Sequence, residues 1–329
     1  EAERMVKLLR GMLCHVNLIP INPIEERDFE KPDILYINKF KAYLEKNNIP
    51  VTIRNSMGAD ISGACGQLRR SASKGEGRTH MEFLFKSHIG MVRKNNEDYC
   101  KGEIIEVGDG SEIGIFAIAD GMGGHNKGEV ASQLAVENLI EFFNDNLIQN
   151  GVVKIDYIED IIKQAYNTVN SMVYDKSKED IIYDGMGTTL TLAVVYKNKA
   201  YIANVGDSRC YILKNGGKLE KITYDHSIVE EYVKANIITE EEARNHPDRN
   251  KITRAVGTEP VVLVDIYDVD LEEGDKILLA TDGLTGAVDR EEIEQTLLNT
   301  DMGDLTQGLV DLANEASGKD NVTVIIVMV

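Results

Sequence analysis

Two nearly uninterrupted apolar segments end abruptly at an aspartate that is followed by a glycine. Ile113–Ala119 is followed by Asp120, and Lys276–Thr281 is followed by Asp282. Apolar segments of this length, bounded by turn residues, are typical of strands that are buried in a core. Each segment therefore predicts a buried strand with a carboxylate at its end.

The other periodic segments predict a layered α+β fold. Strands are predicted at 188–196, 200–205, 208–213, 218–223, 261–269 and 322–329. The first four are joined by tight connections and predict an antiparallel meander. Helices are predicted at 129–146, 155–174, 290–299 and 305–316. Because strands and helices occur in runs and do not alternate strictly, we expect helices packed on antiparallel sheets.

Net charge divides the chain into two parts. Residues 1–80 carry 13 basic and 10 acidic residues, net +3, whereas the rest carries 23 and 45, net −22. Arg69–His80 is small, polar and rich in glycine, which is typical of a linker. Before it, strands predicted at 14–20 and 50–54 flank a helix predicted at 33–46. We therefore expect a small βαβ-like N-terminal fragment ahead of a larger domain.

Composition excludes several classes of protein. The net charge of −19 disfavours nucleic-acid binding. No apolar segment reaches the roughly eighteen residues that a membrane span needs. The N-terminus lacks the pattern of a secretory signal, so we expect a cytoplasmic protein. The four cysteines lie far apart and predict neither a zinc-binding pair nor a disulfide framework.

Acidic residues at the predicted strand ends are candidates for a metal site. Besides Asp120 and Asp282, these are Asp320, which precedes the last predicted strand, and the pair Glu97 and Asp98. Carboxylates a few ångströms apart cannot all stay ionised at neutral pH unless a cation compensates them. Oxygen ligands without neighbouring His or Cys pairs favour Mg²⁺ or Mn²⁺ over zinc. Two such ions bridged by a water would suit in-line attack on phosphorus.

Each of these acidic residues also has a plainer interpretation. An Asp-Gly pair after a strand is most often a turn, and Glu97 with Asp98 alone is more often part of a solvated loop. The joint pattern favours the metal site. Arg93, close to Glu97 in sequence, could then bind two phosphate oxygens through its planar guanidinium.

Residues 81–329 contain eight recognisable motifs. They are Arg93-x-x-Asn96-Glu97-Asp98, Ala119-Asp120-Gly121-Met122-Gly123-Gly124-His125, Gly187-Thr188-Thr189, Val205-Gly206-Asp207-Ser208-Arg209, Asp225-His226-Ser227, Thr253-Arg254-Ala255-Val256-Gly257, Thr281-Asp282-Gly283-Leu284 and Asp320-Asn321. With these motifs the segment resembles the bacterial metal-dependent protein serine/threonine phosphatases of the 2C type. The resemblance implies an α-β-β-α sandwich of two antiparallel sheets flanked by helices, with metals in a cleft between the sheets.

The resemblance also implies a set of metal ligands. Asp120 would bridge two metals. Glu97 and the main-chain carbonyl of Gly121 would bind one of them. Asp282 and Asp320 would bind the other. The implied cofactors are two or three Mn²⁺ or Mg²⁺ ions.

Further roles follow from the same resemblance. Asp98 would act through metal-bound water, and Arg93 would bind the substrate phosphate. Asp207 matches the position of a third, weaker metal, which it would share with Asp282. The implied reaction is hydrolysis of phosphoserine and phosphothreonine by a hydroxide that bridges the metals, without a phosphoenzyme. The chain lacks the Cys-x5-Arg loop of the cysteine-based phosphatases, which agrees with that reaction.

Three side chains near the motifs need separate interpretation. Eukaryotic members have a histidine, often proposed as the general acid, where this chain has Met122. The leaving group therefore needs another proton donor, such as a water on the third metal. His125 is expected to be structural within its glycine turn. His226 is expected to pack beneath the following helix, which Asp225 or Ser227 can cap.

The implied partners are phosphorylated proteins, the products of a bacterial-type serine/threonine kinase. We expect a monomer that binds neither nucleic acid nor membranes. The alternative function is a catalytically silent regulatory module of the same fold. Loss of Asp120, Asp282 or Asp320 would mark such a module, and all three are present.

Within residues 1–70, the segments 14–23, 51–54 and 63–68 resemble the C-terminal tail of the radical-SAM methyltransferases that modify adenosine in ribosomal and transfer RNA. The CxxxCxxC iron–sulfur ligands of that family are absent, so we expect no methyltransferase activity and an inert Cys65. A remnant of such a methyltransferase, fused to the phosphatase, is the remote alternative. The expected domains are a partial tail at 1–68, a linker at 69–80 and a phosphatase domain at 81–329.

Overall fold

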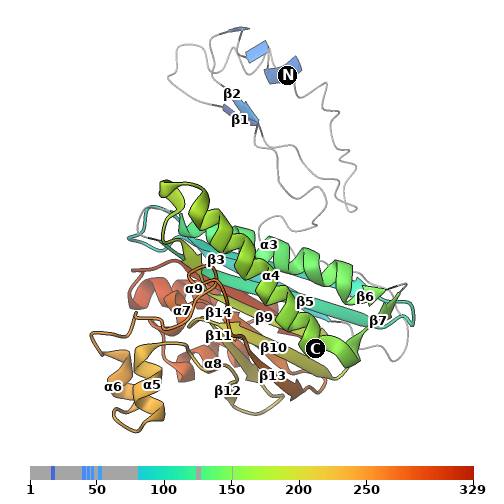
Figure 1. The fold of residues 1–329 in the computed structure, drawn as a ribbon, viewed down its shortest axis with the longest axis vertical. Coiled ribbons are helices and arrows are strands. Elements are labelled where there is room, and N and C mark those ends of the chain that lie inside the picture. The colour runs from blue at the N-terminus through green and yellow to red at the C-terminus, as the bar shows by residue number, and fades with distance from the viewer. Residues whose placement is uncertain are drawn as a thin grey trace. The chain divides into compact units, whose positions relative to one another are not determined.

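The computed structural model describes residues 16–18, 39–41, 43–44, 46–47, 51–53, 81–123, 127–149 and 151–329 (Figure 1). The chain divides into two compact units, residues 1–69 and residues 70–329. Cys65, His125 and nearly all of the predicted linker and tail lie outside the described residues.

The first unit contains a small parallel strand pair. β1 (Val16–Leu18) pairs with β2 (Val51–Ile53) in parallel register. Residues 39–41, between the two strands, are helical. A strand, a helix and a parallel strand in this order agree with the predicted βαβ-like fragment.

The second unit contains two large antiparallel sheets and the small antiparallel pair of β6 (Ile148–Gln149) and β7 (Val152–Val153). The first has the order β13-β10-β9-β5-β4, and its strands are β4 (Asp98–Glu106), β5 (Glu112–Met122), β9 (Leu190–Tyr196), β10 (Lys199–Val205) and β13 (Asp265–Asp270), with β8 (Gly187–Thr188) paired to β5. The second has the order β12-β11-β14-β15-β3, and its strands are β3 (Glu82–His88), β11 (Arg209–Leu213), β12 (Leu219–Lys221), β14 (Lys276–Ala280) and β15 (Val322–Met328).

Helices cover the outer face of each sheet (Figure 1). The first sheet is covered by α3 (Gly128–Asn146) and α4 (Ile158–Glu179), and the second by α7 (Asp282–Thr285), α8 (Arg290–Asn299) and α9 (Leu305–Ala316). The shorter elements are α5 (Ile228–Lys234), α6 (Glu240–Arg244) and the 3₁₀ turns η1 (Ile155–Tyr157), η2 (Ile181–Tyr183) and η3 (Met302–Asp304).

Strand β5 shows why the sequence forms these layers. Ile113 and Ile115 belong to the core under α3 and α4, whereas Phe116 and Ile118 belong to the core between the sheets. Successive side chains of a strand point to opposite faces, so a strand that is covered on both faces must be apolar throughout. The predicted α-β-β-α sandwich is confirmed.

The predicted meander over residues 188–223 is wrong. β9 and β10 form a hairpin, but the chain then crosses to the second sheet, where β11 pairs with β12 and β14. The crossing begins at Gly206, whose φ of +107° favours glycine strongly. A tight connection can join two strands of one sheet or two strands of facing sheets, and the turn residues alone do not distinguish these cases.

Several predicted strand ends also differ from the structure. β5 continues through Asp120 to Met122, because Gly121 and Met122 pair with β8. Asp98 is the first residue of β4 and is buried, so it does not lie in a solvated loop. The strand predicted from 261 begins only at Asp265. No helix in the described part of the chain is long and apolar enough to cross a membrane.

Candidate active site

Four aspartates lie where the two sheets face each other. Asp98 and Asp120 are directly paired in β4 and β5, so their side chains share one face of the first sheet. Asp282 begins α7 just after β14, and Asp320 lies just before β15, the antiparallel neighbour of β14. The hydroxyl of Thr281 joins the two sheets by donating to Asp98 Oδ2 at 2.9 Å. The structure thus brings together aspartates from both sheets in one acidic cluster.

Like charges dominate the electrostatics of this cluster. Burial raises the pKa of Asp98 to about 7, and the charges of Asp282 and Asp320 act in the same direction. Burial, followed by the charge of Asp98, raises the pKa of Asp120 well above its usual range. Burial and the charge of Asp282 raise the pKa of Asp207 to about 8, which places Asp207 in the same cluster. These groups resist full ionisation at neutral pH unless a cation compensates them.

The oxygen atoms of the cluster fit a hard divalent cation. Asp98 Oδ1 and Asp282 Oδ1 are buried and accept no hydrogen bond. An unpartnered buried carboxylate oxygen costs free energy, and oxygen is the ligand atom that Mg²⁺ and Mn²⁺ prefer. Within the described residues, no three His, Cys, Asp or Glu side chains already surround one ion position. Thr281 and Arg93 instead hold one oxygen each of Asp98 and Asp320.

Arg93 lies at the exposed rim of the acidic cluster. Its Nη2 donates to Asp320 Oδ2 at 2.8 Å, and 47% of its side chain is exposed. An exposed ion pair contributes roughly 1 kcal/mol at most, so the guanidinium can exchange this carboxylate for a phosphate at little cost. The residue predicted to bind phosphate is therefore accessible beside the cluster.

Glu97 and Gly121 lie at one end of the cluster. The N–H of Gly121 donates to the carbonyl of Glu97 at 3.0 Å. A β-carbon on Gly121 would overlap the carbonyl of Gly128 in the first turn of α3. Burial raises the pKa of Glu97 above its usual value. Only glycine permits this close approach of strand, loop and helix at the site.

A pair of buried hydroxyls joins Asp120 to Asp207. The Oγ1 of Thr189 accepts a hydrogen bond from the N–H of Asp120 at 2.8 Å and shares another with Ser208 Oγ at 2.7 Å. Ser208 directly follows Asp207 in the crossing between the sheets, and Thr188 Oγ1 donates to the carbonyl of Asp120 at 2.9 Å. The hydroxyl pair therefore fixes the main chain beside two cluster aspartates.

Removing this hydroxyl pair should destabilise the fold. We expect Thr189→Val to lower the free energy of unfolding by about 2 kcal/mol, because Ser208 Oγ and the N–H of Asp120 both lose a buried partner. Thr189→Ser keeps the hydroxyl and should lose less than half as much. Urea denaturation of both variants measures the difference. Equal losses in the two variants would show that the hydroxyl is not the group that stabilises this position.

Comparison with known proteins identifies the larger unit. Residues 86–319 match the sequence profile of the family described as Protein phosphatase 2C. The chain belongs to the protein phosphatase 2C family. The serine/threonine phosphatase stp of Listeria welshimeri is 36% identical over 248 residues, which cover 75% of this chain and 95% of the relative.

Solved structures of the protein phosphatase 2C family agree with this assignment. The serine/threonine phosphatase Stp1 from Staphylococcus aureus is 35% identical, with a TM-score of 0.69 over 79% of this chain and 99% of that one. The catalytic domain of the phosphatase PstP, solved in complex with two manganese ions, is 31% identical, with a TM-score of 0.63 over 75% and 97% of the two chains. The predicted fold class and the predicted phosphoprotein phosphatase function are confirmed.

The family match does not include the residues of the N-terminal predictions. The protein phosphatase 2C match begins at residue 86. The resemblance of residues 1–70 to a methyltransferase tail, and the fusion inferred from it, stay predictions.

Asn321 is a structural residue of the phosphatase domain that sequence reasoning missed. Its Oδ1 accepts from the N–H of Glu97 at 2.8 Å, and its Nδ2 donates to the carbonyls of Ile89 and Asn95, each at 2.9 Å. One buried amide thus holds both ends of residues 89–95, which we call the Arg93 loop. The Asp320-Asn321 motif was visible in the sequence, but nothing in it indicated this contact.

His226 is buried in the phosphatase domain, where its ring contacts Gly206 and Asp265, and Ser227 caps α5. Ser227 Oγ accepts from the N–H of Glu230 at 3.3 Å. The Nδ1 of His226 accepts from the N–H of Gly206 at 3.0 Å, and its Nε2 lies 3.2 Å from Asp265 Oδ2. Burial lowers the pKa of His226. The Nε2 also lies 3.0 Å from Arg254 Nη1, so the neutral ring joins the crossing at Gly206 to Asp265 and Arg254.

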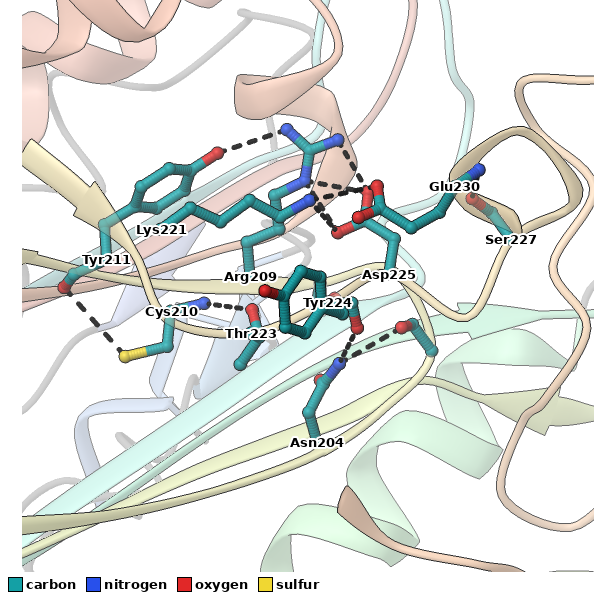
Figure 2. A network of polar contacts seen from close by, with 12 residues as sticks. Asn204, Arg209, Cys210, Tyr211, Lys221, Thr223, Tyr224, Asp225, Ser227 and Glu230 are labelled. Atoms are coloured by element: carbon teal, nitrogen blue, oxygen red, sulfur yellow. Dashed lines mark hydrogen bonds and ion pairs between the residues drawn. The ribbon is translucent and has the colours of Figure 1, made fainter. Parts of the chain in front are cut away.

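Asp225 does not cap α5 but forms an ion-pair network that joins β11, β12 and α5 (Figure 2). The Nε and Nη2 of Arg209 donate to Asp225 Oδ2 at 2.9 and 2.6 Å. Lys221 lies 3.0 Å from Asp225 and 3.2 Å from Glu230. Burial opposes the charge of Asp225, but Arg209 and Lys221 together lower the pKa of its carboxyl. Because Arg209 follows Asp207 by two residues, the network holds the chain beside the acidic cluster.

Proposed function

We propose that residues 81–329 hydrolyse phosphoserine and phosphothreonine in proteins with two or three Mn²⁺ or Mg²⁺ ions. The proposed ligands are Asp120, Asp282, Asp320, Glu97 and the carbonyl of Gly121, with Asp207 at a third ion. When bound, such ions lower the pKa of water and neutralise phosphate charge. The proposal rests on one observation: two buried oxygens, Asp98 Oδ1 and Asp282 Oδ1, have no partner within a cluster of like charges.

The chain itself supplies orientation and proton transfer in this proposal. Arg93, exposed at the rim, binds the phosphate through its guanidinium. Thr281 holds Asp98 by its Oδ2, which leaves Oδ1 to accept a proton from the attacking water. Met122 has no proton to donate, so the leaving group takes its proton from another donor.

The proposed partners are proteins phosphorylated by a bacterial-type serine/threonine kinase. The net charge of −19 supports the proposal that nucleic acid is not a partner. We propose a cytoplasmic monomer.

The first test is hydrolysis by the full chain of p-nitrophenyl phosphate and of a phosphothreonine peptide, with Mn²⁺, with Mg²⁺ and with EDTA. We expect both substrates to be hydrolysed with metal, both activities to stop with EDTA, and both to return when metal is restored. A folded protein that is inactive in every metal would support the silent regulatory module instead.

A further inference from the structure

Two large apolar residues that directly precede Arg93 have solvent-exposed side chains. Met91 is 72% exposed and Val92 is 66% exposed. Single exposed apolar residues are common on protein surfaces and need no explanation. These two are adjacent, and they directly precede the residue that is proposed to bind the substrate phosphate. They are therefore candidates for contact with the rest of the substrate.

The Arg93 loop is held by its main chain, and these two side chains contribute little to its shape. Asn321 holds the carbonyls of Ile89 and Asn95 at its two ends. The N–H of Met91 donates to the carbonyl of Gly318 at 2.7 Å. Gly90 has a φ of +81°, and a β-carbon there would overlap the carbonyl of Asp320. The loop thus presents its apolar side chains in a fixed position without burying them.

Met91 and Val92 directly precede the residue that is proposed to bind the substrate phosphate. Consecutive Cα atoms are about 3.8 Å apart, both between Val92 and Arg93 and between neighbouring residues of a bound peptide. Arg93 itself reaches the acidic cluster through Asp320 at 2.8 Å. A residue that flanks the phosphorylated one is therefore the part of a bound peptide that Met91 and Val92 could contact.

We infer that Met91 and Val92 form an apolar contact for a substrate side chain and select phosphoproteins with an apolar residue next to the phosphorylated one. The inference rests on the proposed function. Burying apolar surface against a loop that is already ordered gains free energy at a small entropic cost. A serine or glycine in the flanking position leaves the two side chains in water and forgoes this gain.

The test compares two phosphothreonine peptides that differ only in one flanking residue, leucine in the first and serine in the second. The full chain is assayed with Mn²⁺ on both peptides and on p-nitrophenyl phosphate. We expect wild type to show a kcat/KM about five- to tenfold higher for the leucine peptide, through KM. The double variant Met91→Ser, Val92→Ser should lose this preference and hydrolyse p-nitrophenyl phosphate as wild type does.

The chain offers a matched control in Val152. It is the same residue type as Val92 and has the same exposed fraction, 66%. Its neighbour Gly151 accepts a hydrogen bond from the N–H of Gly108. Gly108 follows Glu106, the end of β4 that is farthest from Asp98. The eight-residue step from Asp98 to Glu106 spans roughly 26 Å at the usual rise of a strand. Val152→Ser should therefore leave the peptide preference unchanged.

Two outcomes would overturn the inference. The first is that wild type does not discriminate between the peptides, which would mean that no apolar contact exists. The second is that the double variant loses activity equally on both peptides and on p-nitrophenyl phosphate, which would give the loop only a structural role. Failure of the proposed function is separate, because wild type would then hydrolyse none of the three substrates in any metal. That result removes both proposals together.

Discussion

Asp120→Asn is expected to abolish phosphatase activity and to stabilise the metal-free protein at the same time. Activity should fall by at least about a thousandfold, because the proposed bridging carboxylate is lost. The stability gain follows from the position of Asp120 among like charges: burial and the charge of Asp98 raise its pKa, so its ionised form opposes folding. Hydrolysis of p-nitrophenyl phosphate with Mn²⁺, and urea denaturation with EDTA at pH 7.5, measure the two effects.

A surface aspartate provides the control. Asp268, 62% exposed, pairs with Lys199 at 2.7 Å, and this partner lowers the pKa of Asp268. Asp268→Asn removes the same charge from the edge strand β13 of the same sheet, without touching the acidic cluster. It should keep full activity and should not stabilise the metal-free protein. If metal-free Asp120→Asn were less stable than metal-free wild type, repulsion between the carboxylates of the acidic cluster would not be what opposes folding.

The stability of the metal-free protein should depend on pH in a definite direction. A carboxyl whose pKa is higher in the folded state loses its contribution to stability as the pH rises through the window between its unfolded and folded values. For Asp98 and Asp207 this window runs from about 4, the unfolded value, to about 7 and about 8. The EDTA-treated wild type should therefore be more stable at pH 5 than at pH 8. The difference should shrink in Asp120→Asn, and an equal difference in both proteins would count against the coupling.

Gly121→Ala should cost both stability and activity. Its β-carbon would overlap the carbonyl of Gly128 and lie 2.6 Å from the carbonyl oxygen of Glu97. Both are main-chain atoms of packed segments, so neither can move aside as a flexible side chain would. We expect the free energy of unfolding to fall by about 3 kcal/mol or more. Activity should fall as well, because Asp120 and Glu97 are displaced.

Gly123→Ala is the matched control, two residues further along the chain. A β-carbon on Gly123 would meet its nearest neighbours, Gly128 and Met186, at 3.5 Å, which is ordinary contact. Its stability should change by less than about 1 kcal/mol. Thermal and urea unfolding of the two variants give the comparison. Similar losses in both would mean that the close approach at Gly121 is not what limits substitution.

Local patterns account for much of this fold. The helix predicted at 290–299 has the same bounds in α8, because its pattern comes from residues that are neighbours along the chain. The apolar segments before Asp120 and Asp282 likewise predict buried strands, since each strand is covered on both faces. These features can be predicted without knowing which distant residues they contact.

The remaining features depend on distant partners. Thr281 and Asp98 are 183 positions apart, and Asn321 reaches Ile89 across 232 positions. No local pattern specifies such a contact, and the same is true of the crossing at Gly206, where the chain leaves one sheet for the other. The family resemblance predicts which residues form the site, but the contacts that hold them become visible only in three dimensions.

The second sheet has a consequence for synthesis of the protein. β15 lies between β14 and β3, so the last strand of the domain pairs with its first. Asp320 and Asn321 directly precede β15. A nascent chain that stops before residue 320 therefore lacks the partner of β3, one carboxylate of the acidic cluster and the amide that holds the Arg93 loop. We therefore expect translation products that end before residue 320 to lack phosphatase activity, because the proposed site is assembled only after β15 has been synthesised.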